Sequence, residues 1–386
     1  MTRISLSIIP EMSALNDSLT AAVADGKLLD SAKSNILALL GGTTSEVAPK
    51  AVEELVNSGA WEELNDRFFK TLAFGTGGLR GRTIGKVVTT AEQGKGGPND
   101  RPEHPCVGTA TMNFYNVSRA VRGLIAYAKQ FAGPDRKPVL VFAHDTRHFS
   151  RDFAEFCAKT CADLGCDAYL FDGPRATPQL SFAVRELRAD GGVVLTASHN
   201  PSHDNGFKAY FNDGAQIVDP HATAIINEVN AITSERYEAV PESDRGTVTV
   251  LGEEMDALYI SRLKTLLLKP SLLEGASTKI VFTNLHGTGG HINVPMLRGL
   301  GFDVLTVPEQ DIQDGRFPTV ESPNPENGPA LQMGIDLAEK SGAEIVIGTD
   351  PDADRMGVAV RDAAGKMVLL TGNQIGSLMA WYRLKT

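Results

Sequence analysis

The sequence predicts an α/β protein with two consecutive α/β domains, whose mixed, mainly parallel sheets are flanked by helices, and an N-terminal helical extension. Two observations support this prediction. Strand-like and helix-like segments alternate from residue 138 to residue 195, and the alternation restarts after a polar stretch near 232–250. Such alternation is typical of parallel sheets covered by helices. The expected ranges are 1–72 for the extension, 73–245 and 246–368 for the two domains, and 369–386 for the start of a third domain.

The extension has the periodicity of helices over residues 11–72. Apolar residues recur at helix-like spacing, at Leu28, Leu29, Ile36, Leu39 and Leu40 and again at Trp61, Leu64, Phe68 and Leu72. We interpret this segment as a packing extension of the first domain, without chemistry of its own.

The first domain alternates after a loop at 92–106 that is rich in Gly, Pro and charge. Its expected elements are the strand Pro138–Ala143, the helix Arg151–Leu164, the strand Ala168–Phe171, the helix Thr177–Arg188 and the strand Gly192–Leu195. Thr177 is the expected N-cap of the second helix, with Pro178 at its first helical position. The last strand ends directly at Thr196-Ala197-Ser198.

The second domain repeats the pattern. Its expected elements are a helix at 253–268, the strand Lys279–Thr283, the helix His291–Leu300, the strand Val304–Val307, a long loop at 308–329, a helix at 330–341 and the strand Glu344–Ile347. That last strand leads into Gly348-Thr349-Asp350. Both polar loops that follow strands therefore lie where open α/β sheets bind ligands.

Composition excludes several classes of protein. The formal net charge of −10 argues against broad binding to nucleic acid or to an anionic membrane, which require a basic surface. No apolar run approaches the roughly 18 residues of a membrane span, and the N-terminus lacks a signal-peptide core. We therefore expect a cytoplasmic protein. Of the four cysteines, Cys157 and Cys161 are four residues apart, and packed, reduced thiols explain them better than zinc.

Three aspartates in the segment Asp350-x-Asp352-x-Asp354-Arg355 predict a metal site. Carboxylates at alternate positions of a tight loop can converge on one hard cation, and Mg²⁺ prefers oxygen ligands and keeps positions open for phosphate or water. A calcium-binding EF-hand loop also begins with this spacing. It fails here because the sixth position is Arg355 instead of Gly and the twelfth is Arg361 instead of Glu.

A serine at a strand-to-loop corner is the candidate nucleophile. Ser198 lies in Thr196-Ala197-Ser198-His199-Asn200-Pro201, and a serine there could hold a phosphoryl group beside a cation. His199 is ambiguous, because partners in nucleophilic catalysis meet in space and seldom in sequence. Lys208, further along the segment, could carry a proton or pair with phosphate if it is partly buried.

Three further segments give weak signals individually. The glycine-rich Phe74-Gly75-Thr76-Gly77-Gly78-Leu79-Arg80-Gly81 could approach a phosphate closely, although its spacing is neither of the common nucleotide-binding patterns. The others are Asp145-Thr146-Arg147 after the first strand and His286-Gly287-Thr288-Gly289-Gly290 in the second domain. Taken alone, the glycine-rich segment is by default a flexible turn, and the segment at His286 is either a ligand loop or a tight strand-helix turn.

Taken in order, these segments resemble the α-D-phosphohexomutase superfamily of phosphoglucomutases, phosphomannomutases and related sugar-phosphate mutases. The matching strings are FGTGGLRG, HDTRHFS, TASHNPSHDNGFKAY and GTDPDADR, which span residues 74 to 355. The helical lead-in and the segment ESPNPEN at 321–327 look most like the phosphoglucomutase/phosphopentomutase-type branch.

The resemblance implies a mechanism. Ser198 would carry a phosphoryl group, and Mg²⁺ would be bound by Asp350, Asp352, Asp354 and an oxygen of that group. Transfer to a sugar monophosphate would give a bisphosphorylated intermediate, of the glucose 1,6-bisphosphate type that also serves as activator, and would exchange the 1- and 6-phosphates. By the same resemblance, Arg80 and Arg355 would pair with phosphate, Arg147 and His286 are further candidates for binding phosphate or substrate, and Lys208, with His199 as second choice, would handle the hydroxyl proton.

The chain departs from the family at its C-terminal end. The signatures that the resemblance implies for a sugar-selecting third domain and a phosphate-binding fourth domain do not occur. Residues 369–386 resemble the opening helix of the third domain. We therefore expect a truncated chain that keeps the serine and metal sites but lacks substrate specificity and most mutase activity, with glucose, mannose and pentose phosphates all open as substrates.

Two rival functions remain. A metal-dependent phosphatase with a serine nucleophile would release phosphate and need no bisphosphate activator. A non-enzymatic phosphoprotein would take up phosphate on Ser198 and never pass it on. We favour the mutase, with glucose 1-phosphate and glucose 6-phosphate as its substrates.

Overall fold

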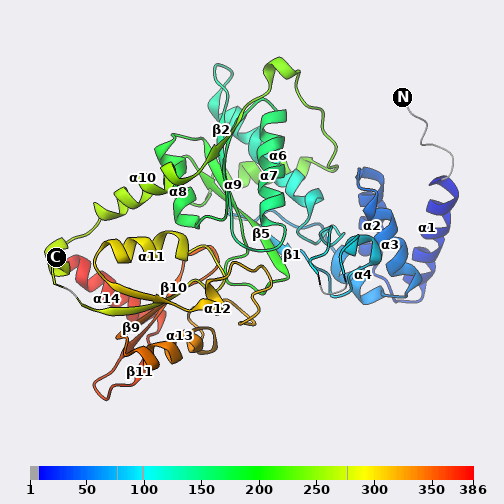
Figure 1. Ribbon diagram of the computed structural model, residues 1–386. Coiled ribbons are helices and arrows are strands. Elements are labelled where there is room, and N and C mark those ends of the chain that lie inside the picture. The colour runs from blue at the N-terminus through cyan, green and yellow to red at the C-terminus, as the bar shows by residue number, and fades with distance from the viewer. Residues whose placement is uncertain (1–7, 76, 98–99, 276) are drawn as a thin grey trace.

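The computed structural model describes residues 8–75, 77–97, 100–275 and 277–386, with side chains from residue 13 onward. Figure 1 shows three parts: an N-terminal group of helices, a first domain around one sheet, and a second domain around another. Two α/β sheets flanked by helices, behind a helical extension, confirm the predicted fold class. No helix in the described part of the chain is long and apolar enough to cross a membrane.

The N-terminal helices form a small bundle with its own apolar core beside the first domain (Figure 1). Their bounds are α1 (Ile8–Ala24), α2 (Asp30–Gly42), α3 (Val47–Asn57) and α4 (Trp61–Phe68). A buried guanidinium joins the bundle to the first domain: Arg67 of α4 binds Glu63 at 2.7 Å and Glu92 at 2.5 Å. Because a buried charge is costly unless paired, these contacts fix the bundle in place.

The first sheet has six strands in the order β1-β5-β4-β2-β3-β6. The strands are β1 (Gly78–Arg82), β2 (Val139–His144), β3 (Asp167–Phe171), β4 (Gly191–Leu195), β5 (Asp204–Phe211) and β6 (Val248–Leu251). The parallel core is β4, β2, β3 and β6, and β5 runs antiparallel to its neighbours. Glycine is required at Gly78, since a Cβ there would lie 1.7 Å from the carbonyl oxygen of Phe207.

Helices cover both faces of this sheet. They are α5 (Thr90–Gln93), α6 (Phe114–Ala132), α7 (Ser150–Asp163), α8 (Thr177–Glu186), α9 (His221–Ala231) and α10 (Glu253–Lys264). The core against α6, α7 and α9 includes Phe142, Phe153 and Phe207, and all four cysteines of the chain are buried. Helix α8 begins one residue earlier than expected, with Ala176 as its N-cap instead of Thr177.

The boundary between the domains lies later than expected. Strand β6 pairs in parallel with β3, from Ala168 opposite Val248 to Phe171 opposite Leu251. Residues 248–251 therefore belong to the first sheet, although the sequence placed everything after residue 245 in the second domain. A four-residue strand after a polar stretch carries too little pattern to show which sheet it joins.

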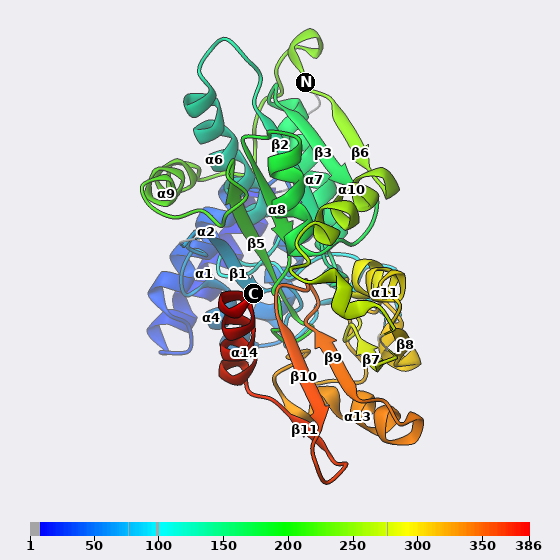
Figure 2. The same cartoon turned by 90° about the vertical axis from the view of Figure 1, so that its left-hand side faces the viewer.

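The second sheet has five strands in the order β11-β10-β9-β7-β8, with β7, β8 and β9 parallel and β10 antiparallel to both neighbours. The strands are β7 (Lys279–Thr283), β8 (Asp303–Thr306), β9 (Ile345–Thr349), β10 (Met356–Arg361) and β11 (Met367–Leu369). The helices are α11 (Gly290–Gly299), α12 (Pro308–Asp311), α13 (Gly328–Ser341) and α14 (Gly372–Lys385). Figure 2 shows the first domain above the second, with the loops of both at the junction.

Candidate functional site

Ser198 lies in the loop that follows β4, in a backbone conformation that residues other than glycine rarely adopt. Its φ is +53°, in the left-handed region, and it is buried. The Ser198 amide donates to Thr196 Oγ1 at 2.8 Å. A residue other than glycine in this region indicates strain that its surroundings impose, and such strain is concentrated at functional sites.

The serine hydroxyl contacts the second domain. Ser198 Oγ donates a hydrogen bond to Asp350 Oδ2 at 2.6 Å, and Asp350 directly follows strand β9. The carboxyl ends of β4 and β9, in separate sheets, therefore meet at one point. This brings together the two loops that the sequence identified independently.

The three aspartates form one cluster. One oxygen of each carboxylate of Asp350, Asp352 and Asp354 lies within 4.8 Å of the others. Both domains hold the loop in place: Thr288 Oγ1 of the second domain donates to the Pro351 carbonyl at 2.9 Å, and Thr177 Oγ1 of the first donates to Asp352 Oδ2 at 2.6 Å.

Lys208 is the cation of this cluster. Its Nζ donates to Asp352 Oδ2 at 2.6 Å and to Asp354 Oδ2 at 2.7 Å. Burial alone would lower the pKa of Lys208, but the charges of the two aspartates outweigh it and hold the pKa above its usual range. For the Asp352 carboxyl, burial alone would raise the pKa, but the Lys208 ammonium outweighs burial and holds that pKa below its usual range.

Asp350 carries the excess charge of the cluster. Burial, together with the charges of Asp352 and Asp354, raises the pKa of Asp350 to about 8. When all three carboxylates are ionised, the ammonium leaves two negative charges, which is the charge a divalent cation balances, so a bound cation would favour the ionised form of Asp350. Asp352 Oδ1 is buried and accepts no hydrogen bond from the described residues, which suits it to be a metal ligand. The residues fit Mg²⁺.

Three further residues of the predicted site lie around Ser198. His199 Nδ1 is 3.4 Å from Ser198 Oγ, and burial together with the nearby arginine charges lowers the pKa of its imidazole. Arg80 is exposed on β1 and donates to Asn200 Oδ1 at 3.2 Å. The side chain of Arg355 is 46% exposed beside Asp354. Both guanidinium groups are open to an incoming anion.

Two predicted phosphate-binding residues do not fit that role. The Arg147 side chain is fully buried and donates to Asp145 and to four backbone carbonyls, so it has no donor left for a phosphate. His286 is buried as well, with Nδ1 2.8 Å from the Ile312 carbonyl and Nε2 2.8 Å from Thr319 Oγ1. Both residues hold loops together, because their polar atoms are fully used inside the protein.

Several contacts that complete the site could not be read from the sequence. Thr196 Oγ1 donates to Asp145 Oδ2 at 2.7 Å, and Ser322 Oγ of the second domain donates to the His199 carbonyl at 2.8 Å. Thr177 was expected only as a helix cap. Of these hydroxyl-bearing residues, Thr196 alone belongs to the segment 196–201 that contains the candidate nucleophile, so its position in that segment is the sequence signal for its role. Thr76 of the glycine-rich segment lies outside the described residues.

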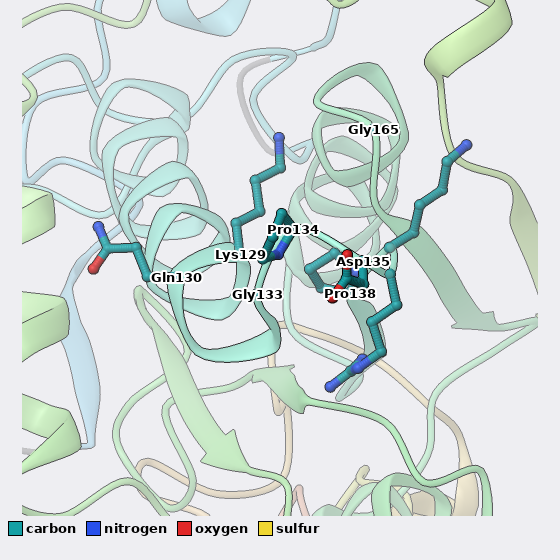
Figure 3. A pocket seen from close by; sticks show the side chains of 9 residues that line it. Lys129, Gln130, Gly133, Pro134, Asp135, Pro138 and Gly165 are labelled. Carbon is teal, nitrogen blue, oxygen red and sulfur yellow. The ribbon is translucent and has the colours of Figure 1, made fainter.

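A large hollow on the molecule lies elsewhere. It has a volume of about 630 Å³ and is lined by residues between Lys129 and Pro138 together with Gly165. Pro138 precedes β2, so the hollow is at the opposite end of that strand from Asp145. Figure 3 shows Lys129 and Gln130 extending away from each other, without converging on a common point. The hollow therefore has no part in the site.

Fold and site together define an α/β protein in which a buried serine of one sheet meets an acidic cluster of the next. Two family models match this chain: phosphoglucomutase/phosphomannomutase, alpha/beta/alpha domain I, over residues 106–236, and domain II of the same family, over residues 257–365. The chain belongs to the phosphoglucomutase/phosphomannomutase family, within the α-D-phosphohexomutase superfamily of enzymes.

Individual relatives agree with this assignment. A phosphoglucomutase of Staphylococcus epidermidis is 34% identical over 338 residues, which cover 86% of this chain and 57% of the relative. A phosphoribomutase of Saccharomyces cerevisiae is 36% identical over 357 residues, covering 86% of this chain and 53% of the relative. A solved phosphomannomutase-type structure from Thermus thermophilus has a TM-score of 0.63 at 28% identity, covering 82% of this chain and 62% of that one. The chain thus spans about half the length of the curated relatives it matches.

Proposed function

We propose that this chain carries the phosphoserine and metal centre of a phosphosugar mutase. The mutase would interconvert the 1- and 6-phosphates of a hexose, with glucose 1-phosphate and glucose 6-phosphate as the first substrates to test. One observation carries the proposal: Ser198 Oγ lies 2.6 Å from Asp350 Oδ2, inside the three-aspartate cluster. A hydroxyl group held against an acidic metal site is placed for phosphoryl transfer.

The proposed reaction moves one phosphoryl group at a time. The bond between phosphorus and Ser198 Oγ breaks as a sugar hydroxyl forms a new bond to phosphorus, giving a sugar bisphosphate. The bisphosphate turns over, and its other phosphoryl group returns to Ser198 Oγ. Each transfer breaks one P–O bond and forms another, so the phosphorylated serine is regenerated at the end of the cycle. A bisphosphate of the glucose 1,6-bisphosphate type would phosphorylate the serine initially.

Mg²⁺ is the cation we assign to Asp350, Asp352, Asp354 and an oxygen of the serine-bound phosphoryl group, and it would supply charge neutralisation there. Arg80, which contacts Asn200, and Arg355, beside Asp354, add positive charge near the serine loop. In phosphoryl transfer, positioning and charge neutralisation account for most of the catalysis.

The protons have two candidate carriers near the serine. A neutral imidazole can accept a proton, and the lowered pKa of His199 supports a role as base 3.4 Å from Ser198 Oγ. The Lys208 ammonium is held by two carboxylates that raise its pKa, so it gives up a proton less readily and would instead stabilise negative charge on the reacting oxygens. His199 therefore becomes the first candidate for the proton of the sugar hydroxyl, ahead of Lys208, which the sequence alone favours.

The substrate class is a small sugar phosphate. The names of the relatives, a phosphoglucomutase and a phosphoribomutase, support a sugar phosphate without selecting the sugar. Mannose and pentose phosphates are the alternatives to glucose phosphates.

The test is phosphate uptake on Ser198. Incubation with glucose 1,6-bisphosphate and Mg²⁺ should add the mass of one phosphoryl group, mapped by peptide mass spectrometry to Ser198, and a sugar monophosphate should then remove it. Ser198→Ala should take up none, whereas Ser202→Ala, four residues along the same segment, should match the unmodified chain. No uptake by the unmodified chain would refute the proposal. Transfer of the group to water would indicate a phosphatase, and a group that never leaves would indicate a non-enzymatic phosphoprotein.

A further inference from the structure

Arg147 lies buried beneath the backbone of the loop that carries Ser198. Its five N–H donors are matched by five acceptors. Nε donates to Asp145 Oδ2 at 3.1 Å, Nη2 donates to the carbonyls of Ser198 and Asn200 at 2.6 Å each, and Nη1 donates to those of Pro201 at 2.7 Å and Asp204 at 3.1 Å. One planar group therefore fixes the path of the backbone from residue 198 to residue 204.

Asp145 ties the same loop from its other side. Its Oδ1 accepts from the Ser150 hydroxyl at 2.7 Å, and its Oδ2 accepts from the Thr196 hydroxyl, which in turn accepts the Ser198 amide. Arg147 thus holds the Ser198 carbonyl. Asp145 holds the Ser198 amide indirectly, through the Thr196 hydroxyl. The positive φ of Ser198 is maintained by contacts on both sides.

The second domain packs against one face of this guanidinium. Arg147 Cζ lies 4.9 Å from the ring centroid of Phe317, which is buried and belongs to the loop after α12. That loop packs closely on the β2–α7 turn, because a Cβ at Gly315 would lie 2.7 Å from the His148 amide nitrogen. Arg147 therefore contacts the serine loop of the first domain and a loop of the domain that carries the aspartates.

We propose that Arg147 is a positioning residue that sets Ser198 Oγ against the aspartate cluster, with Phe317 of the second domain closing over it. The planar fork is essential, because lysine retains the charge but supplies three donors in a different geometry. The expected effect of Arg147 on the rate of phosphoryl transfer rests on the proposed function. The expected effect of Arg147 on the conformation of the serine loop is independent of that function.

The test uses Arg147→Lys and Phe317→Leu in the whole chain. In hydrogen–deuterium exchange without substrate, the amides of residues 198–205 should exchange about tenfold faster in Arg147→Lys, while those of β2 and β4 stay unchanged. The rate of phosphoryl uptake from glucose 1,6-bisphosphate should fall about 100-fold, as expected when a reacting group is displaced. Mg²⁺ affinity should stay as in the unmodified chain, since the aspartates are untouched. Phe317→Leu should act in the same direction, more weakly.

Arg151→Lys is the matched control. Arg151 is exposed, follows the same turn and pairs with Glu155, so the substitution should change neither the exchange of the 198–205 amides nor the rate of phosphoryl uptake. Should Arg147→Lys fail to fold, Phe317→Leu decides by the same measurements. Unchanged exchange of the 198–205 amides in the variant would overturn the inference. Faster exchange with an unchanged rate of phosphoryl uptake would also overturn it. So would a loss of Mg²⁺ affinity that parallels the loss of rate. If the unmodified chain takes up no phosphate, the proposed function fails, and the exchange experiment still decides whether Arg147 holds the loop.

Discussion

Ser198 and Asp350 are 152 positions apart in the chain and follow strands of different sheets, yet the Ser198 hydroxyl donates to the Asp350 carboxylate at 2.6 Å. Neither sheet alone makes a site. Packing the two domains against each other places the hydroxyl within the acidic cluster, so the stability of the interface and the chemistry of the site depend on the same contacts.

The positive φ of Ser198 predicts an unusual order of stabilities. Ser198→Ala and Ser198→Gly both remove the hydroxyl and its bond to Asp350. Glycine adopts a φ of +53° without strain, whereas alanine does not, so Ser198→Gly should be more stable than Ser198→Ala by about 1 kcal/mol. Urea unfolding of the two variants measures this difference. Equal stabilities would show that the backbone relaxes in the variants.

The sequence places its candidate nucleophile and metal ligands in short local motifs. Ser198 follows one readable strand and the three aspartates share the loop after another, and the carboxyl ends of strands in open α/β sheets bind ligands. The loops around Ser198 and Asp350 could therefore be identified before any contact between them was known. Their contact could not be read from the sequence, because it depends on how two domains pack.

The errors have a common physical cause. Arg147 and His286 stand in loops beside the site, and the residue type alone cannot show whether a guanidinium or imidazole points toward a ligand or into the protein. Their partners lie 26 to 57 positions away along the chain, except for Asp145. The sequence pattern does not predict strand β6 for a related reason, since a short strand joins whichever sheet edge tertiary packing offers it.

Asp350→Asn should have opposite effects with and without metal. Without metal, the raised pKa of Asp350 means that folding takes up a proton near neutral pH, and asparagine removes this cost while keeping an acceptor for the Arg355 amide. The metal-free variant should therefore be more stable by about 1–2 kcal/mol. Added Mg²⁺ should raise the melting temperature of the unmodified chain but not that of the variant.

Thermal melting in chelator and in excess Mg²⁺ measures both effects. Asp336→Asn, at an exposed position of α13, is the matched control and should respond to Mg²⁺ like the unmodified chain. A variant that still gains stability from Mg²⁺ would remove Asp350 from the set of metal ligands.

A buried carboxylate at the junction of the domains predicts a loss of stability in acid. Burial would raise the pKa of Asp256, but hydrogen bonds from Arg175 at 2.8 Å and His291 at 2.9 Å outweigh it and hold the pKa below its usual 3.8. A lowered folded-state pKa adds stability that is complete above the unfolded-state value and is lost as pH falls through the folded-state value.

The free energy of unfolding should therefore fall more steeply below about pH 3.8 in the unmodified chain than in Asp256→Asn. At neutral pH the variant should already be less stable, since Arg175 loses its charged partner. Urea unfolding across this pH range makes the comparison. Parallel curves for the two proteins would show that another group controls the acid transition.

Lys208→Met should strengthen metal binding while weakening catalysis. The ammonium lies 2.6 Å from Asp352 Oδ2 and 2.7 Å from Asp354 Oδ2, where it competes with a cation for the same carboxylates. Methionine fills a similar volume without charge, so the affinity for Mg²⁺ should rise about tenfold. Isothermal titration calorimetry measures the affinity, and the rate of phosphate uptake on Ser198 should fall about 100-fold with the loss of the positive charge that stabilises the transferring phosphoryl group.

Lys279→Met is the control for this change, since its lysine is a partly exposed residue of the second domain and approaches Asp303 only to 3.7 Å. It should alter neither the affinity nor the rate. Weaker Mg²⁺ binding in Lys208→Met would contradict the competition argument. It would mean that the ammonium assembles the aspartates into a metal site, and that the repulsion among three carboxylates opens the loop when Lys208 is removed.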